Sequence, residues 1–405
     1  MGICIKEALR LIKNNITKVS FEIIPIENAN KRVSAENIQA SYFLPPFNNS
    51  AMDGYGVKLI DAGKNVKVID EIFAGSKKQT DINANEAIKI MTGARVPDSI
   101  EAVVPMELVE IVDESRIKLP ENLKENQHIR FIGEDITKDE VIINDGETIN
   151  FATIAILASQ GITHVKVYRK PKVSVFTSGE ELKLHYEQIK EYQIFNSNTP
   201  TLRARVKEFG ADVTFTGKAD DTVESIQKMI QNSLYNDLII TTGGISVGEA
   251  DFTAEAFESL GMETIFYGVS IKPGKPTLFG KIGSTYILNL PGNPLAAALI
   301  FEIFGTIIMQ KLSGSKEIFH NVIHTKISEE FHNKKGRTTI IPGEFNGEYF
   351  TPAEKRFPGM VSVLHRCNCI MILDKNLEHL NKNDKVKIIP INWKFFSENQ
   401  VDFFN

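Results

Sequence analysis

The stretch LIITTGGISVGEADF, residues 238–252, runs from an apolar segment into two glycines and ends in carboxylates where a second segment begins. Its first residues, rich in Leu and Ile, are typical of a strand buried in a sheet. Residues 251–261 then have the pattern of an amphipathic helix. The sequence therefore predicts a strand, a turn of bare backbone and a helix in direct succession.

The same alternation of strand and helix continues over residues 171–314. The expected strands lie within 172–179, 211–219, 237–244, 263–271 and 285–292, and the expected helices within 199–210, 221–236, 251–261 and from 294 onward. This pattern predicts a central α/β domain with a doubly wound, mostly parallel, three-layer sheet. Such sheets bind ligands at the carboxyl ends of their strands, so residues 177–181, 241–248 and 290–294 are expected on one rim.

The segments on either side of this domain have other patterns. Residues 1–170 mix short helices with β-like runs and predict an α+β N-terminal region of two subdomains, with a β-rich insert at about 45–140. Residues 315–405 contain short β-type runs and predict a small all-β, barrel-like domain. At 405 residues the chain is long enough for several domains.

Composition excludes several classes of protein. The net charge of −5 argues against broad binding to nucleic acid or to an anionic membrane. The three cysteines do not have a zinc or disulfide spacing, which favours free thiols in a reducing compartment. The most apolar segment, 295–309, is shorter than a bilayer span and contains Glu302. We therefore expect a cytoplasmic protein without a membrane segment.

The glycine turn is the first candidate site. Gly243 and Gly244 leave backbone N–H groups unshielded, and the helix that follows directs the positive end of its dipole toward them, which suits a phosphate. Glu249 and Asp251 would repel that ligand unless a divalent cation bridges them. We therefore expect a phosphorylated ligand with Mg²⁺, and the alternative is a tight turn with an acidic first helical turn. The glycine order fits neither the dinucleotide fingerprint nor a P-loop.

A second candidate is the segment SIKPGKPTLFG, residues 270–280, in which Lys272 and Lys275 flank a Pro-Gly turn. Pro273 and Pro276 stiffen the segment, which lowers the entropy cost of holding two ammonium groups near one point. Two fixed cations suit an oxyanion. The alternative is a solvated basic turn.

A third candidate is the connection from strand to helix in NLPGNPLAAAL, residues 289–299. Asn293 suits the N-cap of the helix and Pro294 its first turn. With Pro291 and Gly292 they predict an anion-accepting helix start, although a plain connector would have the same sequence.

The N-terminal region gives weaker signals. Asp53 lies in the turn-rich segment 42–57, and Thr92 and Asp135 lie beside glycines farther along the chain. The eight histidines show no metal-binding spacing, and no Gly-x-Ser-x-Gly elbow occurs. Covalent catalysis is therefore not expected.

Seven motifs together closely resemble those of the molybdopterin molybdenumtransferases, a family that includes the E domain of gephyrin. They occur in the family's order and cover roughly residues 1–310. The motifs are LPPFNNSAMDGYGV (44–57), IMTGARVP (90–97), GEDI (133–136), TSGEEL (177–182), TTGGISVGEADF (241–252), IKPGKPTLFG (271–280) and LPGNPLAAAL (290–299).

The resemblance implies an elongated homodimer of four-subdomain chains. It also implies the reaction: adenylylated molybdopterin and molybdate give molybdenum cofactor and AMP, assisted by Mg²⁺. Other enzymes of molybdenum cofactor biosynthesis are implied as partners.

The resemblance also assigns roles to the candidate residues. Asp53, Asp135 and Asp251 are the implied catalytic carboxylates, and Asp53, Thr92 and Asp135 would complete the cleft of the other subunit. The pyrophosphate and adenylate would bind around Gly243, Gly244 and Ser246. Molybdate would bind at Lys272 and Lys275, and Mg²⁺ at acidic residues of the rim. The implied substrate-binding residues are Thr92, Gly243, Gly244, Ser246, Lys272, Lys275, Pro291, Gly292 and Asn293, and the implied metal ligands are Glu181, Asp251 and, as a third, Asp237.

The sequence departs from the family pattern at three places. Asn48 and Asn196 stand where many relatives have Asp, so neither is assigned to a metal. Pro358 stands in a turn where relatives often have Ser, which leaves Ser362 and Arg337 as the nearest candidates for an anion contact.

Two other functions fit parts of the sequence. A molybdopterin adenylyltransferase would use a sheet domain like residues 171–314, but the N-terminal region with its Asp53 motif argues against it. A non-catalytic scaffold of the same fold is the other alternative, and the intact Lys272, Lys275 and Asp251 favour catalysis.

Overall fold

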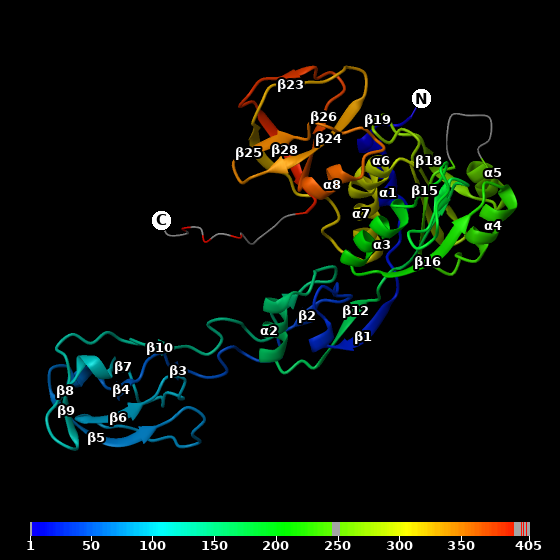
Figure 1. The fold of residues 1–405 in the computed structure, drawn as a ribbon. Coiled ribbons are helices and arrows are strands. Elements are labelled where there is room, and N and C mark those ends of the chain that lie inside the picture. The colour runs from blue at the N-terminus through cyan, green and yellow to red at the C-terminus, as the bar shows by residue number, and fades with distance from the viewer. Residues whose placement is uncertain (1, 245–251, 393–397, 399, 401, 403–405) are drawn as a thin grey trace.

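The computed structural model describes residues 2–244 and 252–392, together with 398, 400 and 402. Ser246 and Asp251 lie outside the described residues. Figure 1 shows an elongated chain, with a β-rich module at one end, a small α+β module next to it, and the sheet domain and a β-barrel at the other end. The expected multidomain α/β architecture is confirmed.

The sheet domain contains six strands in the order β16-β13-β17-β21-β20-β18. The first four are parallel, whereas β20 is antiparallel to both of its neighbours. The expectation of a mostly parallel sheet is confirmed, but β20 was not predicted as a strand. The strands are β13 (Lys172–Ser178), β16 (Asp212–Ala219), β17 (Leu238–Thr242), β18 (Glu263–Tyr267), β20 (Leu278–Ile282) and β21 (Thr285–Leu290).

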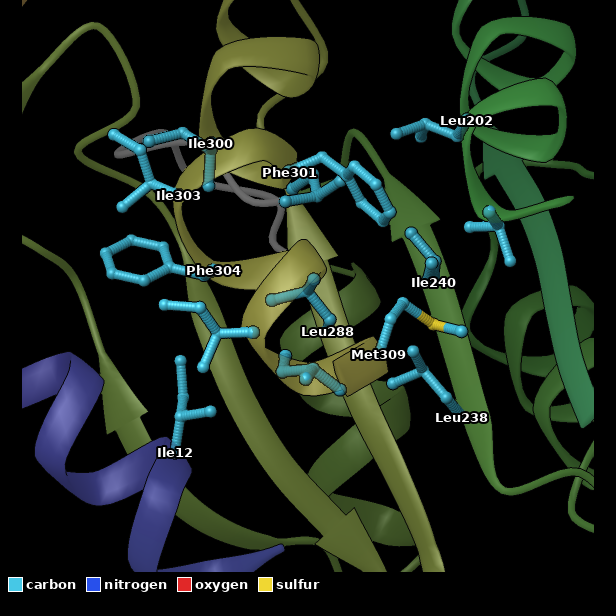
Figure 2. Packing of buried hydrophobic residues seen from close by; sticks show 14 of the residues in the cluster. Ile12, Leu202, Leu238, Ile240, Leu288, Ile300, Phe301, Ile303, Phe304 and Met309 are labelled. Atoms are coloured by element: carbon cyan, nitrogen blue, oxygen red, sulfur yellow. The ribbon is translucent and has the colours of Figure 1, made fainter. Parts of the chain in front are cut away.

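Two hydrophobic cores cover the two faces of this sheet. Alternate residues of a strand point to opposite faces, so Leu238 and Ile240 join one core and Ile239 joins the other. Figure 2 shows the first core, where Leu288 and Met309 lie beside Leu238 and Ile240. The helices of the domain are α3 (Asn198–Glu208), α4 (Val223–Gln231), α5 (Phe252–Ser259), α6 (Pro294–Ile300), the π-helical turn η4 (Phe301–Gly305) and α7 (Thr306–Leu312).

The first helix of the chain belongs to the core of the sheet domain. In α1 (Ile5–Asn15), Ala8 and Ile12 are fully buried in the same core as Leu288. The sequence placed this helix in an N-terminal region of residues 1–170. Its packing against α7 instead makes it part of a domain whose strands begin at Lys172.

Among the described residues, one helical stretch, Pro294–Leu312, is long and apolar enough to cross a membrane. However, 89% of its most apolar window is buried inside the protein. Within it, Glu302 is ion-paired to Arg205 of α3 at 2.8 Å. The stretch is the core helix of the sheet domain.

The N-terminal region consists of two modules. The smaller pairs β1 with β12 and β2 with β11, and α2 packs beside them. The larger is the expected β-rich insert, with a sheet of order β7-β4-β6-β5-β9-β8. Their elements are β1 (Phe21–Pro25), η1 (Ile26–Asn28), β2 (Ile38–Gln39), β3 (Asn49–Ser50), β4 (Gly54–Val57), η2 (Leu59–Asp61), β5 (Asn65–Ile72), β6 (Glu86–Ile90), β7 (Ala102–Pro105), η3 (Met106–Leu108), β8 (Glu110–Ile111), β9 (Arg116–Lys118), β10 (Ile129–Arg130), β11 (Val141–Ile143), α2 (Phe151–Ser159) and β12 (His164–Tyr168).

The C-terminal domain is a closed barrel, as expected, because β24, β25, β22, β28 and β26 pair in a ring. One strand from the sheet domain, β19 (Ile271–Lys272), adds to β24 in parallel and joins the lysine turn to the barrel. The elements are β22 (Ile323–Ile327), β23 (Phe331–His332), β24 (Thr338–Phe345), β25 (Tyr349–Pro352), α8 (Ser362–Arg366), β26 (Cys369–Leu373), β27 (His379–Leu380) and β28 (Lys385–Pro390), and a ribbon of β14 (Leu182–Lys183) and β15 (Ile194–Phe195) extends from the sheet domain.

Candidate functional site

A cleft of about 800 Å³ lies at the carboxyl ends of β13, β17 and β21. The loops that follow these three strands contribute to it, together with β15, the start of α3 and the turn at Gly359. Six of the expected site residues line the cleft: Glu181, Gly243, Gly244, Pro291, Gly292 and Asn293.

The glycine turn forms a wall of the cleft that only glycine can build. Gly243 and Gly244 have φ of +87° and +70°, which side chains rarely adopt. A Cβ on Gly244 would lie 1.8 Å from the hydroxyl oxygen of Thr253, and one on Gly292 would lie 3.4 Å from the Cα of Gly243. Backbone from two loops therefore comes into close contact here and leaves room for a ligand above it.

Buried asparagines fix these loops, and the sequence did not single them out. The Asn289 amide donates to the Gly243 carbonyl at 3.2 Å, and the Asn198 amide donates to the Gly292 carbonyl at 2.7 Å. The side-chain oxygen of Asn198 is buried, and so is the hydroxyl oxygen of Thr253. Within the described part of the chain neither oxygen has a hydrogen-bond partner. Both residues line the cleft, so they offer polar groups to a bound molecule.

Two carboxylates line the cleft in the described residues. Glu181 is exposed, and Asp221 accepts a hydrogen bond from the Glu180 amide at 3.1 Å. Asp221 was missed by the sequence analysis, although it follows the carboxyl end of β16 and the strand-end rule would have found it. Carboxylate oxygens are ligands that Mg²⁺ prefers, so the donors present fit this ion.

The two lysines do not line this cleft. Lys272 instead lines a neighbouring cavity of about 320 Å³ between the sheet domain and the barrel, which also contains Lys334, Arg356 and the carboxylate of Glu354. Lys275 lines neither cavity; its carbonyl accepts hydrogen bonds from the amides on either side of the turn. The structure therefore provides basic side chains from the barrel that the sequence did not identify.

The turn at Pro358 and Gly359 lies between the two cavities. Pro358 lines the basic cavity and Gly359 lines the cleft. The Pro358 carbonyl accepts the Leu295 amide at 2.9 Å and so occupies one donor of the α6 start. Of the alternatives named from the sequence, Ser362 lines a separate hollow and Arg337 lines neither cavity.

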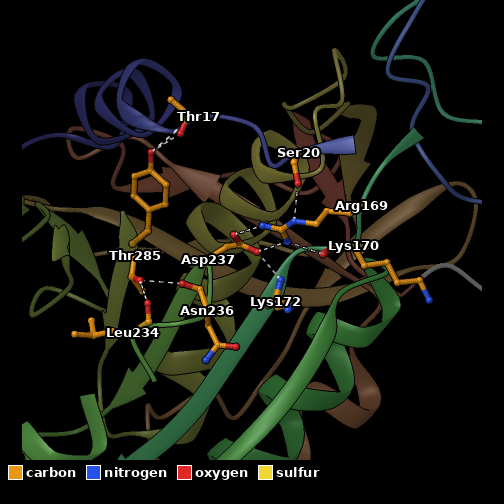
Figure 3. A network of polar contacts seen from close by, with 10 residues as sticks. Thr17, Ser20, Arg169, Lys170, Lys172, Leu234, Asn236, Asp237 and Thr285 are labelled. Atoms are coloured by element: carbon orange, nitrogen blue, oxygen red, sulfur yellow. Dashed lines mark hydrogen bonds and ion pairs between the residues drawn. The ribbon is translucent and has the colours of Figure 1, made fainter. Parts of the chain in front are cut away.

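The assignment of Asp237 to the metal is corrected by the structure. Asp237 precedes β17 and lies at its amino end, the opposite end from the cleft. Both of its oxygens accept hydrogen bonds from the Arg169 guanidinium at 2.7 Å, and one also accepts the Lys172 amide (Figure 3). These contacts raise the pKa of Arg169 and make Asp237 a structural partner.

Asp53 and Thr92 come together in the β-rich insert. The Asp53 carboxylate accepts the Thr92 amide at 2.7 Å and its hydroxyl at 2.8 Å, and these bonds hold the pKa of Asp53 below its ordinary value. Asp135 is exposed and its amide donates to the Leu44 carbonyl. Figure 1 places this module, with β4 and β6, at the far end of the chain from the sheet domain. The structure therefore does not bring these residues to the cleft of their own chain.

Asn196 and Asn48 both have structural roles that suit their neutral amides. Asn196 accepts the Thr199 amide at the start of α3 and donates to the Thr199 hydroxyl. Asn48 accepts the Ile132 amide.

A cleft walled by glycine turns and carboxylates at the strand ends of a doubly wound sheet is typical of α/β proteins that bind small molecules. Family models extend this description over nearly the whole chain. They match the MoeA N-terminal region (domains I and II) at residues 3–161, a probable molybdopterin-binding domain at 174–311 and the MoeA C-terminal region (domain IV) at 325–391.

Relatives agree with the family models. Molybdopterin molybdenumtransferase of Staphylococcus aureus is 31% identical over 95% of this chain and 94% of its own length, and that of Haemophilus influenzae is 33% identical over 92% and 94%. A crystal structure of the molybdopterin biosynthesis MoeA protein from Pyrococcus horikoshii has a TM-score of 0.82 at 28% identity and covers 97% of this chain and all of its own. The chain belongs to the molybdopterin molybdenumtransferase family and is a transferase.

Proposed function

We propose that this protein inserts molybdenum from molybdate into adenylylated molybdopterin and releases AMP, the last step that makes molybdenum cofactor. Family membership supports molybdenum insertion. The observation that carries the finer proposal is the pairing of two adjacent sites: a cleft with glycine turns and carboxylates, and a basic cavity containing Lys272.

The cleft would hold the adenylylated molybdopterin. The Gly243 amide already donates to the Leu290 carbonyl at 3.2 Å, so the Gly244 amide would be the backbone donor to the substrate's diphosphate, because unshielded N–H groups bind anionic oxygens. The buried oxygens of Asn198 and Thr253 would contact the polar edges of the rings and so orient the substrate. Ser246 and the Pro-Gly-Asn turn at 291–293 belong to the same proposed subsite.

Glu181 and Asp221 would hold Mg²⁺ in this cleft, together with Asp251, which lies outside the described residues. The ion, when bound, would offset the negative charge of the phosphate oxygens. The protein's own contribution would be to hold the diphosphate at the Gly244 turn and to keep the reacting phosphorus near these carboxylates.

Molybdate would bind in the basic cavity. Lys272, Lys334 and Arg356 carry three positive charges against one negative charge of Glu354, which suits a tetrahedral dianion. Lys275, which lines neither cavity, would add only to the positive potential around this ligand. The turn at 358–359 lies between the two cavities and would separate the two ligands.

A second copy of the chain would complete the site. Asp53, Thr92 and Asp135 lie at the far end of their own chain from the sheet domain, so they reach a cleft only in a partner subunit (Figure 1). We therefore propose a homodimer with a composite active site that acts in the cytoplasm beside other enzymes of the same biosynthesis.

The experiment that tests the proposal measures AMP release from adenylylated molybdopterin with and without molybdate. We expect release to depend on molybdate in the purified protein. Formation of adenylylated molybdopterin from Mg-ATP and molybdopterin would instead support an adenylyltransferase. A protein that shows neither activity yet binds a protein partner would support a scaffold.

A variant of the basic cavity tests the molybdate site. Lys272→Ala removes one of its charges, so the molybdate concentration for half-maximal AMP release should rise by about tenfold or more. Lys207→Ala, which removes an exposed charge from α3 of the same domain, is the matched control and should leave that concentration unchanged. An unaltered molybdate dependence in Lys272→Ala would refute the oxyanion assignment.

A further inference from the structure

We propose that the β23–β27 ribbon of the barrel carries a binding site for a divalent transition metal of the Zn²⁺ type, made by Glu330, His332 and His379. One ligand atom from each side chain lies within 4.8 Å of the other two. This group was not visible as a motif, because its two histidines are far apart in the sequence. It is separate from the residues assigned to Mg²⁺ and does not depend on the proposed reaction.

The three side chains converge on one point. The Nε2 atom of His379 lies 2.7 Å from an Oε1 oxygen of Glu330, and the Nε2 atom of His332 lies 3.1 Å from the same oxygen. A cation that enters between these atoms would replace the hydrogen bonds with metal bonds after small side-chain movements.

The ribbon holds the two imidazoles in position. His332 and His379 are directly opposite each other in the antiparallel register, with ring centroids 4.6 Å apart. On the other face, the neighbouring pair Phe331 and Leu380 is buried in the barrel core. The backbone that presents the imidazoles is therefore anchored before any ion binds, which lowers the entropy cost of forming the site.

The type of donor decides the type of metal. Two imidazole nitrogens and one carboxylate oxygen suit Zn²⁺ and its transition-metal neighbours, whereas Mg²⁺ and Ca²⁺ prefer oxygen ligands. Three protein ligands leave a fourth position for water. The side chains of Glu330 and His332 are 61% and 75% exposed, so an ion can reach the site from solvent.

The charges nearby limit the affinity. Lys334 and Lys335 follow His332 in the chain and oppose a dication, although Lys335 is ion-paired to Glu378 at 2.8 Å. We therefore expect a site that binds zinc reversibly. His332 also lines the basic cavity, so an ion here would increase the positive potential beside Lys272.

Calorimetric titration of the chelator-treated, full-length protein with ZnCl₂ tests the proposal. We expect one ion per chain, with an affinity that falls more than about tenfold in His332→Ala and in His379→Ala, because each loses a ligand. His324→Ala is the matched control, since His324 is an exposed strand histidine of the same barrel outside the cluster. Equal zinc affinity in the wild type and the double variant H332A/H379A would overturn the site.

Two further measurements distinguish this site from zinc bound elsewhere on the chain. The Co²⁺-loaded protein should show visible bands of a low-coordinate site without a sulfur charge-transfer band, whereas a sulfur band would assign the ion to the exposed Cys4 and overturn the proposal. Zinc should also raise the Tm of the wild type and of His324→Ala, but not that of the double variant, because an ion that binds only the folded state stabilises it. Excess Mg²⁺ should not displace the zinc.

Discussion

At the scale of single residues, the three cysteines differ in their surroundings. Burial raises the pKa of the Cys367 thiol to about 11 and that of Cys369 to about 12, whereas Cys4 is exposed. Because the thiolate is the reactive form, both barrel thiols stay protonated and inert at neutral pH. Both side chains therefore serve packing.

This difference predicts the outcome of a thiol titration. At pH 7 to 8 a disulfide reagent such as DTNB should modify one thiol per native chain rapidly, and three after denaturation. Cys4→Ser should abolish the rapid phase and leave two thiols in the denatured chain. A second rapid thiol in the native protein would show that the packing around Cys367 or Cys369 is open to the reagent.

Glu181 and Asp237 should give opposite results when their charges are removed. Asp237→Asn breaks the paired hydrogen bonds with Arg169, so we expect the free energy of unfolding in urea to fall by about 1–3 kcal/mol while the Mg²⁺ dependence of AMP release is unchanged. Glu181→Gln should leave stability unchanged and raise the Mg²⁺ requirement. Loss of Mg²⁺ dependence in Asp237→Asn alone would restore the original metal assignment.

At the scale of elements, the glycine turn after β17 allows a controlled comparison. Gly244 and Gly210 have similar φ values, +70° and +78°, so an alanine at either should cost about 1–2 kcal/mol of backbone strain. Only at Gly244 would the new Cβ also collide with Thr253, at 1.8 Å. We expect Gly210→Ala to retain AMP release and Gly244→Ala to lose it, with a larger drop in Tm.

Much of the central domain could be predicted because its signals are local. Runs of Val, Ile and Leu marked the parallel strands, and the strand-end rule placed Glu181, Gly243 and Gly292 on one rim. The strand β20 was missed because residues 278–282 contain a glycine and a lysine and follow a turn that was interpreted only as an anion site.

The rest of the site depends on contacts between segments far apart in the chain. Lys334 and Arg356 reach the cavity of Lys272 only because β19 pairs with β24 of the barrel, and no periodicity in the sequence encodes that pairing. The packing of α1 against α7 could not be predicted for the same reason. The sequence of an amphipathic helix shows which face is apolar but not which element covers that face. Asp237 was assigned to the metal from resemblance alone. It precedes β17 and therefore lies at the amino end of the sheet strands, opposite the cleft.

At the scale of the whole molecule, the elongated shape leads to a test of the proposed dimer. At a molybdate concentration that saturates only the wild type, Asp53→Ala and Lys272→Ala should each lose most of their activity. Subunits of the two kinds co-expressed with different tags should form dimers with one intact composite site. An equal mixture should then recover about a quarter of wild-type activity, because half of the dimers are mixed and each has one of two sites.

The matched control for this test combines two variants of the same half-site, such as Asp53→Ala with Thr92→Ala. Their mixture should recover no activity, because every site lacks a residue from the insert. If the mixture of Asp53→Ala and Lys272→Ala recovers no more activity than the separate variants, each chain completes its own cleft.

The docking of α1 also has a consequence for synthesis of the chain on the ribosome. Chains are made from the N-terminus, and their domains usually fold in that order. Here α1 is synthesised first, whereas α7, the helix that covers it, ends at Leu312. The apolar face of α1 therefore stays uncovered until roughly three hundred further residues have been translated. The nascent protein therefore has a long interval in which a chaperone would find Ala8 and Ile12 uncovered, although the finished enzyme buries both completely.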